Sequence, residues 1–367
     1  MSKKIKVLHV QLTENFGGIE SLLTNVYANI DRSKYQFDFI VTAKKPYQKK
    51  LTDLGGNVFL LPSIKQTVSY IKAFNEILNN NYDIVHFHKN SAANIIPILI
   101  VKNHPTHPKI IVHSHNTFPS IQNKVLVRLH RINRIFLSRM ADKKIACSNA
   151  AANWMFGKKD NVQIINNGID IKRFTFSDID RRTIRNKYNI KKIDFVVGAV
   201  GRFTKQKNYK MTIDIFNEVR KLRKDSKLMI IGDGYLKRDL VKQVHQLGLE
   251  DDVLFLGLQL NVSPYLSAMD AFLMPSIYEG LGIAAVEAQS EGLPTYISNR
   301  FPKEINLTTL VRRFSLKQSP RNIANLIIDG IKQNNRSEKT AMEIEKSNYS
   351  LTSTVQSLAN LYRKLSK

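Results

Sequence analysis

The chain has 367 residues, a length that suits two domains, and its 43% hydrophobic content excludes a disordered or fibrous protein. The formal net charge of +26 favours an anionic partner, which leaves nucleic acid, anionic lipid and phosphorylated substrates open. The single cysteine, Cys147, excludes an intramolecular disulfide and fits a reducing cytosol.

Short buried strands and helical patterns alternate through the first half of the chain. The apolar N-terminal run begins like a signal peptide, but Gln11, Thr13 and Glu14 interrupt it, so we expect a first strand. No apolar run in the sequence is long enough to span a bilayer. The expected strands are residues 6–11, 37–42, 57–61, 83–88, 109–113 and 143–147, and the expected helices include 19–30, 69–79 and 124–140.

A turn at residues 166–170 and a polar basic stretch through Lys192 are interpreted as a hinge and linker. Within it, Asp178-Ile179-Asp180 matches a metal-binding DxD, but its place away from a strand end indicates a solvated loop. A second alternation follows, with strands at 195–201, 227–232, 253–257, 271–274 and 295–298, helices at 211–224 and 236–247, and a last helix at 351–365. The pattern predicts an α/β fold of parallel sheets covered on both faces, with ligands at the carboxyl ends of the strands.

Three turns that follow expected strands suit a phosphate. Glycine lets backbone amides approach a phosphate closely, and cations beside a helix N-terminus neutralise a diphosphate. Adjacent glycines are also common as plain turn chemistry, and a basic loop is unremarkable in so basic a chain. The turn Gly232-Asp233-Gly234 lacks the third glycine of a dinucleotide fingerprint. The residues concerned are Gly17, Gly18, Arg202, Lys207, Gly232 and Gly234.

Two glutamates bracket a small, apolar, glycine-bearing segment. Glu279 is expected on a loop, and Glu287 about one and a half turns into a helix over residues 283–291. The amides at the helix start point outward with the positive end of the dipole and suit a phosphate. One carboxylate can then take sugar hydroxyls and the other ribose hydroxyls. The alternative is that Glu279 caps the helix and Glu287 lies on its wet face.

The histidines include two tight pairs at strand ends, His86/His88 and His113/His115. Strand alternation places both members of a pair on one face, which raises the question of zinc. Zinc needs a third ligand, and no HExxH or CxxC motif accompanies the pairs, so we expect no metal. Packed or capping histidines, and histidines that touch a substrate, remain open.

Residues 124–144 form a basic helix in which arginines interleave with apolar residues. It either packs on the sheet with a solvated basic face or docks on anionic lipid. The arginines are Arg128, Arg131, Arg134 and Arg139.

These motifs together resemble retaining GT-B glycosyltransferases of family 4. Residues 275–294 are similar to the E-x7-E motif, 201–207 to G-R-x4-K, and 17–20 to GG-x-E, while His115-Asn116 stands where the family usually has H-D. The resemblance implies two Rossmann-like doubly wound domains facing a central cleft. The first, residues 1–170, lies on the acceptor side, and the second, 171–350, binds the donor. The helix at 351–367 crosses back to pack on the first domain.

The resemblance also assigns the site. It implies no metal and no cofactor, with a nucleotide sugar, most simply a UDP-sugar, as co-substrate. The implied catalytic residues are His115, Glu279, Arg202 and Lys207, and the acceptor-side residues are His88, His115 and Asn116. The implied donor-binding residues are Gly17, Gly18, Arg202, Lys207, Gly232, Gly234, Glu279, Gly280, Leu281, Gly282, Ile283 and Glu287.

The resulting expectation is a retaining glycosyltransferase of bacterial cell-surface polysaccharide synthesis. It would use a saccharide acceptor carried on a lipid, and would be cytoplasmic and peripheral on the inner face of the membrane. The alternative is a basic, noncatalytic protein that binds nucleotide or nucleic acid. That alternative explains the charge, but it does not explain two carboxylates beside phosphate loops, and no RRM, KH or helix-turn-helix signature is present.

Overall fold

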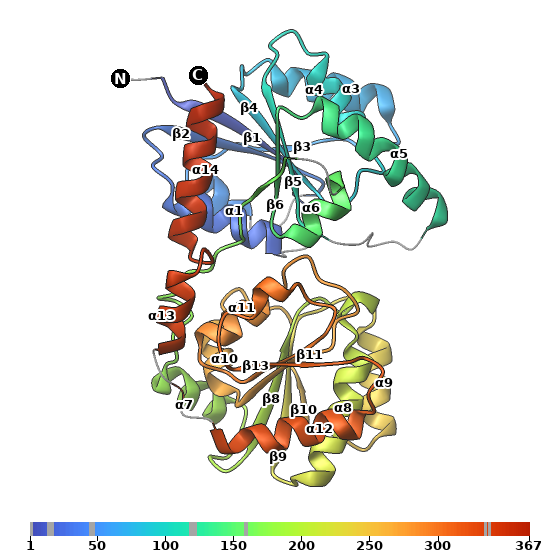
Figure 1. Ribbon diagram of the computed structural model, residues 1–367, viewed down its shortest axis with the longest axis vertical. Helices are drawn as coiled ribbons and strands as arrows, with labels where there is room; N and C mark the ends of the chain where they lie inside the picture. The colour runs from blue at the N-terminus through green and yellow to red at the C-terminus, as the bar shows by residue number, and fades with distance from the viewer. Residues whose placement is uncertain are drawn as a thin grey trace. The chain divides into compact units, whose positions relative to one another are not determined.

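The structure of the protein is a computed structural model, shown in Figure 1. It describes residues 3–12, 18–43, 48–116, 123–157, 161–333, 336 and 339–367, with the backbone alone at 11, 12, 332, 333 and 339. The chain divides into two compact units. Unit 1 contains residues 1–168 and 351–367, and unit 2 contains residues 169–350.

Unit 1 is built on a seven-stranded sheet in the order β3-β2-β1-β4-β5-β6-β7, and all its neighbouring strands are parallel. The first six strands were predicted, and β7 is an additional two-residue strand. The strands are β1 Ile5–Leu12, β2 Tyr35–Val41, β3 Val58–Leu60, β4 Ile84–Lys89, β5 Lys109–Ser114, β6 Lys143–Ala146 and β7 Gln163–Ile164. The helices are α1 Gly18–Asn29, α2 Lys49–Asp53, α3 Thr67–Leu78, α4 Ile96–Lys102, α5 Lys124–Met140, α6 Asn149–Phe156 and α14 Leu351–Leu365.

The sheet of unit 1 is buried on both faces, because successive side chains of its strands point to opposite sides. Val7 and Ile84 lie in a core with side chains of α1 and α14. Their neighbours in the chain, Leu8 and Val85, lie in a second core with side chains of α3 and α4. The predicted return of the C-terminal helix to the first domain is confirmed, since α14 contacts α1 and the Tyr35 hydroxyl donates to the Ala359 carbonyl at 2.9 Å.

Unit 2 is built on a six-stranded parallel sheet in the order β10-β9-β8-β11-β12-β13. Its first five strands were predicted. The strands are β8 Phe195–Val200, β9 Ser226–Ile231, β10 Val253–Phe255, β11 Ala271–Met274, β12 Thr295–Ser298 and β13 Val311–Phe314. The helices are α7 Asp178–Lys187, η2 Lys205–Lys207, α8 Tyr209–Leu222, α9 Lys237–Gln246, α10 Ser263–Ala268, α11 Ile283–Ser290, η3 Lys303–Ile305, α12 Pro320–Asp329, η4 Gly330–Gln333 and α13 Lys339–Lys346.

The interpretation of residues 170–192 as a linker is wrong, because helix α7 lies within it. The Ser177 side chain caps this helix by accepting from the amide of Asp180 at 3.1 Å. Arg181 and Arg185 each form an ion pair with Asp270 at 2.6 Å. The DxD triplet is therefore the first turn of a helix and not a loop, and it remains away from the strand ends.

Candidate functional site

Three loops of unit 2 meet at the carboxyl ends of the neighbouring strands β9, β8 and β11. The Phe203 amide donates to the Asp233 carbonyl at 2.8 Å and joins the loops after β8 and β9. The Ile277 amide donates to the Gln206 carbonyl at 2.8 Å and joins the loops after β8 and β11. Because β8 is the first strand of this sheet, the strand order reverses between β8 and β11. Open α/β sheets bind their ligands at such a reversal.

Two glycines make this arrangement possible. Gly232 has φ of 141°, and a Cβ atom there would collide with the Gly201 carbonyl, so only glycine lets the two loops approach. Gly282 has φ of 84° and occupies the N-cap of α11, where a Cβ atom would collide with the Phe301 ring. Glycine there lets the Phe301 ring pack against the start of α11.

Lys207 and Glu279 form a buried ion pair at the centre of the joined loops. Lys207 Nζ lies 2.7 Å from Glu279 Oε1, and their side chains are 18% and 6% exposed. Glu279 also lies near Tyr209, whose hydroxyl pKa is raised first by burial and then by this carboxylate. The N-cap residue of α11 is Gly282 and not Glu279.

Arg202 is exposed at the beginning of the same loop. It lies close enough to Tyr278 to oppose the rise in the pKa of that phenol, a rise caused by burial and by Glu279. The two predicted cations thus differ, since Lys207 is held by a carboxylate and Arg202 faces solvent. Gly234, Gly280, Leu281 and Ile283 lie in the joined loops or at the start of α11.

Glu287 is half-buried on α11. Burial raises the pKa of its carboxyl to about 8, Arg173 opposes this rise and Glu291 adds to it. Glu287 is thus partly, but not fully, exposed on the helix. The carboxyl is protonated at neutral pH, so it can both donate and accept a hydrogen bond.

The remaining predicted residues belong to unit 1. Gly17 lies outside the described residues, and Gly18 opens α1 with its surface exposed. His88 lies near the end of β4, and His115 and Asn116 follow β5. All three therefore lie at the carboxyl edge of the sheet, where ligands of such folds bind.

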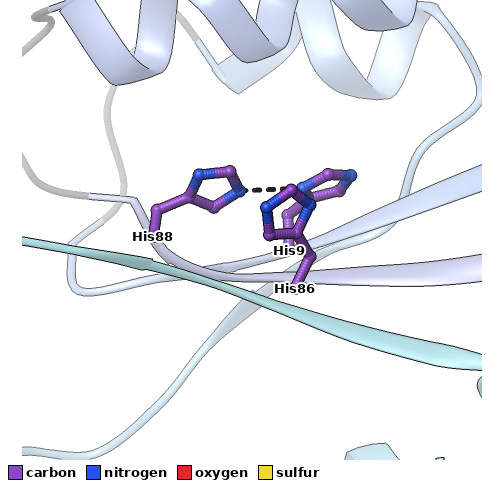
Figure 2. A group of neighbouring side chains, drawn as sticks. All are labelled: His9, His86 and His88. Atoms are coloured by element: carbon purple, nitrogen blue, oxygen red, sulfur yellow. Dashed lines mark hydrogen bonds between the residues drawn. The ribbon is translucent and has the colours of Figure 1, made fainter. Parts of the chain in front are cut away.

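The two predicted histidine pairs form one cluster with His9 of β1, a residue that the sequence analysis missed. Figure 2 shows three of its members, His9, His86 and His88. His9 Nδ1 lies 3.0 Å from His88 Nε2, and His88 Nδ1 lies 2.9 Å from His115 Nε2. Burial lowers the pKa of His9 and of His115 to about 3, so both imidazoles are neutral at neutral pH. The register of β1 against β4, which pairs His9 with His86, is the feature that brings His9 into the cluster.

His9 also supplies the third nitrogen that a zinc site requires. His9, His86 and His88 offer ligand atoms within 4.8 Å of one another, as do His88, His113 and His115. However, the rings of His86 and His88 stack with centroids 4.2 Å apart and planes 25° from parallel. Imidazole lone pairs lie in the ring plane, so stacked rings do not direct them at a common ion. The observed arrangement supports hydrogen bonding better than metal binding.

The comparisons with known proteins agree with these motifs. Residues 180–350 match the family described as "Glycosyl transferases group 1", and residues 16–173 match "Glycosyltransferase Family 4". EpsF of Bacillus subtilis (strain 168) is 30% identical over 330 residues, which cover 86% of this chain and 85% of that protein. A UDP-Gal:alpha-D-GlcNAc-diphosphoundecaprenol alpha-1,3-galactosyltransferase of Escherichia coli is 27% identical, with coverages of 81% and 80%.

The fold comparison gives the same answer. The crystal structure of Anabaena HepE in complex with UDP and glucose superposes with a TM-score of 0.81 over 97% of this chain and 99% of that chain, at 18% identity. The noncatalytic alternative is not favoured. The family matches, the relative of Bacillus subtilis and the fold comparison therefore show that the chain is a GT-B glycosyltransferase and belongs to the group 1, family 4 glycosyltransferases.

Proposed function

We propose that the protein transfers a sugar from a UDP-sugar to a saccharide carried on a lipid diphosphate, with retention of configuration, in cell-surface polysaccharide synthesis. The Escherichia coli relative is named for a UDP-sugar and a diphosphoundecaprenol acceptor, and the Anabaena neighbour is in complex with UDP and glucose. In this chain, the buried Lys207–Glu279 pair between β8 and β11 is the observation that carries the proposal.

The pair suits the charge that develops when the sugar leaves. Breaking the bond between the anomeric carbon and the diphosphate oxygen leaves a negative charge on that oxygen. Lys207, Arg202 and the amides of residues 280–283 are the donors for this charge, which preorganised donors stabilise strongly. The acceptor hydroxyl attacks the anomeric carbon from the same face and gives its proton to the leaving diphosphate. Glu279 orients Lys207 and accepts from sugar hydroxyls.

Glu287 has a separate role in this proposal. Its carboxyl, protonated at neutral pH, pairs with the two hydroxyls of the ribose as donor and acceptor. It therefore contributes to the binding of the nucleotide and not to the transfer of the sugar.

Turnover of UDP-sugars tests the assignment. We expect release of UDP that is accelerated by a lipid-diphosphate saccharide, and a loss of kcat of about a hundredfold or more in R202A. R182A, which removes an exposed arginine of α7, is the matched control and keeps wild-type turnover. The absence of UDP release from every UDP-sugar, with and without acceptor, would refute the proposal. Wild-type turnover of R202A would show that Arg202 does not stabilise the leaving diphosphate.

A membrane-facing role of helix α5 is the second part of the proposal. No helix in the described part of the chain has the length and hydropathy needed to cross a bilayer. On α5, only His130 and Leu137 are buried, and apolar side chains are exposed beside the arginines. The exposed fractions are Val125 65%, Leu129 40%, Ile132 50%, Ile135 54% and Phe136 50%. A helix that presents both apolar and basic side chains to solvent suits an anionic lipid surface.

Vesicle co-sedimentation tests this role. Changing the four arginines of α5 to glutamine is expected to weaken binding to anionic vesicles by more than about a hundredfold, at about 1 kcal/mol for each charge. A control with the same change of charge removes four exposed cations of unit 2 and keeps binding. It changes Lys224, Lys237, Arg238 and Lys242 to glutamine. Equal loss in both variants, or binding that is insensitive to salt, would contradict docking through α5.

A further inference from the structure

The histidine cluster of unit 1 contains a continuous chain of hydrogen-bonded rings. His9 Nδ1 meets His88 Nε2 at 3.0 Å, and His88 Nδ1 meets His115 Nε2 at 2.9 Å. Both nitrogens of His88 are therefore used, and each end of the chain has one nitrogen left. Those end atoms, His9 Nε2 and His115 Nδ1, are buried and have no hydrogen-bond partner among the described residues.

Neighbouring rings hold the chain in place. His88 stacks on His86 with centroids 4.2 Å apart, and His115 lies over His113 with centroids 3.9 Å apart. His86 is fixed in turn, because its Nδ1 lies 2.8 Å from the hydroxyl of Tyr362 on α14. Rotation of the His88 ring or of the His115 ring would break this packing, so the fold sets the positions of their nitrogens.

The protons of the chain have two possible arrangements. Each neutral imidazole carries one N–H, and each contact between rings needs one donor and one acceptor. In the first arrangement protons point toward His9, which leaves an unpaired N–H on His9 and a bare lone pair on His115. In the second they point toward His115, which leaves the lone pair on His9 and the N–H on His115.

Both end atoms are buried, so the places of the two residues in the sheet distinguish these arrangements. His9 is 0% exposed in the middle of β1, whereas His115 is partly exposed beyond the end of β5. A buried N–H without a partner costs about 1–3 kcal/mol and is rarer than an acceptor without one. The second arrangement places the unpaired donor at the carboxyl edge of the sheet, where a bound ligand would supply the acceptor, and leaves only a lone pair in the interior.

We infer that the His9–His88–His115 chain fixes His115 as the Nδ1–H tautomer, so that His115 presents a hydrogen-bond donor to an oxygen of a saccharide bound at the carboxyl edge of the unit 1 sheet. His88 and His9 are then positioning residues, which act through His115. The inference depends on the proposed function only for the identity of the oxygen. The protonation of His115 is a property of unit 1 alone.

Nitrogen NMR tests this without any substrate. In protein labelled with 15N-histidine, long-range correlations distinguish a protonated from a bare ring nitrogen, and H115A identifies the signals of His115 among the nine histidines. H245A, which removes an exposed histidine of α9, is the control for assignment. We expect the Nδ1–H tautomer for His115. An Nε2–H tautomer would overturn the inference.

Two substitutions of His88 separate positioning from simple packing. The amide in H88N takes the place of Nδ1 and can still donate to His115, whereas the amide in H88Q takes the place of Nε2 and reaches only His9. We expect H88N to keep the Nδ1–H tautomer and H88Q to lose it. With a UDP-sugar, kcat should fall by about tenfold to a hundredfold more in H88Q than in H88N, with little change in the donor KM. The same tautomer in both variants would overturn the inference.

The measurements also separate this inference from the proposed function and from metal binding. If the protein has the expected His115 tautomer but no turnover, the result supports the hydrogen-bonded chain of histidines and counts against the proposed function. Elemental analysis and titration with Zn²⁺ form the metal arm. Stoichiometric zinc, with loss of the ring protons of His88 on binding, would overturn the chain, whereas unchanged histidine signals support it.

Discussion

Replacing Lys207 separates the stability of the loops from their chemistry. K207M leaves the Glu279 carboxylate, which is 6% exposed, without its cation. Breaking a buried ion pair by removing one partner costs about 3–5 kcal/mol. The lower value, about 3 kcal/mol, applies because Lys207 itself keeps 18% exposure. E279Q should cost less, since an amide still accepts a hydrogen bond from the ammonium group.

The double variant K207M/E279Q provides the decisive comparison. It leaves no unpaired charge, so its free energy of unfolding should exceed that expected from adding the two single losses by about 1.5 kcal/mol or more. Its turnover should not recover, because the donor to the leaving diphosphate is still missing. A loss of about 10²–10³ in kcat is expected for K207M and for the double variant.

Urea unfolding, followed by tryptophan fluorescence and by circular dichroism, measures the loss of stability in unit 2 separately from unit 1. Trp154, the only tryptophan of the chain, lies in unit 1, so its fluorescence is an internal control. Circular dichroism reports both units, and the midpoint for unit 2 should fall in K207M while the fluorescence midpoint stays constant. Strictly additive losses in the cycle, or full turnover of the double variant, would refute the reasoning.

Three further predictions follow from unit 2. Because the Glu287 pKa is raised from 4.5 to about 8 in the folded state, the free energy of unfolding should fall as pH rises between these values, by up to about 1.4 kcal/mol per pH unit. E287Q should remove this fall and weaken UDP binding in calorimetry, and unchanged affinity would contradict the ribose contact. G232A should lose UDP affinity and more stability in urea unfolding than G248A, which meets no atom within 4 Å and has only its φ of 63° to accommodate. R202A should keep wild-type stability within about 0.5 kcal/mol, since Arg202 is exposed, while kcat falls.

The sequence predicted those elements whose signal is local. The buried strands of both sheets are short apolar runs, and helix α14 has the bounds that were predicted. Helix α5 matches the predicted range 124–140, whereas the basic helix described as residues 124–144 is wrong at its end, because Lys143 and Lys144 belong to strand β6. Helix α7 was missed because its polar sequence is held by arginine pairs to Asp270, about 85–89 residues away in the chain. Strand β13 was missed because its sequence, Val311–Phe314, contains two arginines and pairs only at the edge of the sheet.

The candidate site shows the same division. The individual residues of the glycine, lysine and glutamate motifs were found from spacing, but the pairing of Lys207 with Glu279 spans 72 residues and depends on the order of the strands. His9 had no local signal, because one histidine in an apolar strand is compatible with packing. It becomes informative only when the register brings β1, β4 and β5 together.

The composition of one face of the first sheet argues for function in the histidine cluster. Along β1, β4 and β5 this face begins with Val7, Ile84 and Ile111 and then changes to imidazoles toward the carboxyl ends. Apolar side chains would bury equally well there and would leave no nitrogen unpaired, whereas five ring nitrogens of the cluster have no partner among the described residues. At about 1–3 kcal/mol for each buried polar group left unpaired, the imidazoles reduce the stability of unit 1. This layer of imidazoles opposes folding, and its hydrogen bonds lead to the carboxyl edge of the sheet, where ligands bind. The hydrogen-bond donor that His115 presents at that edge explains why the layer is there.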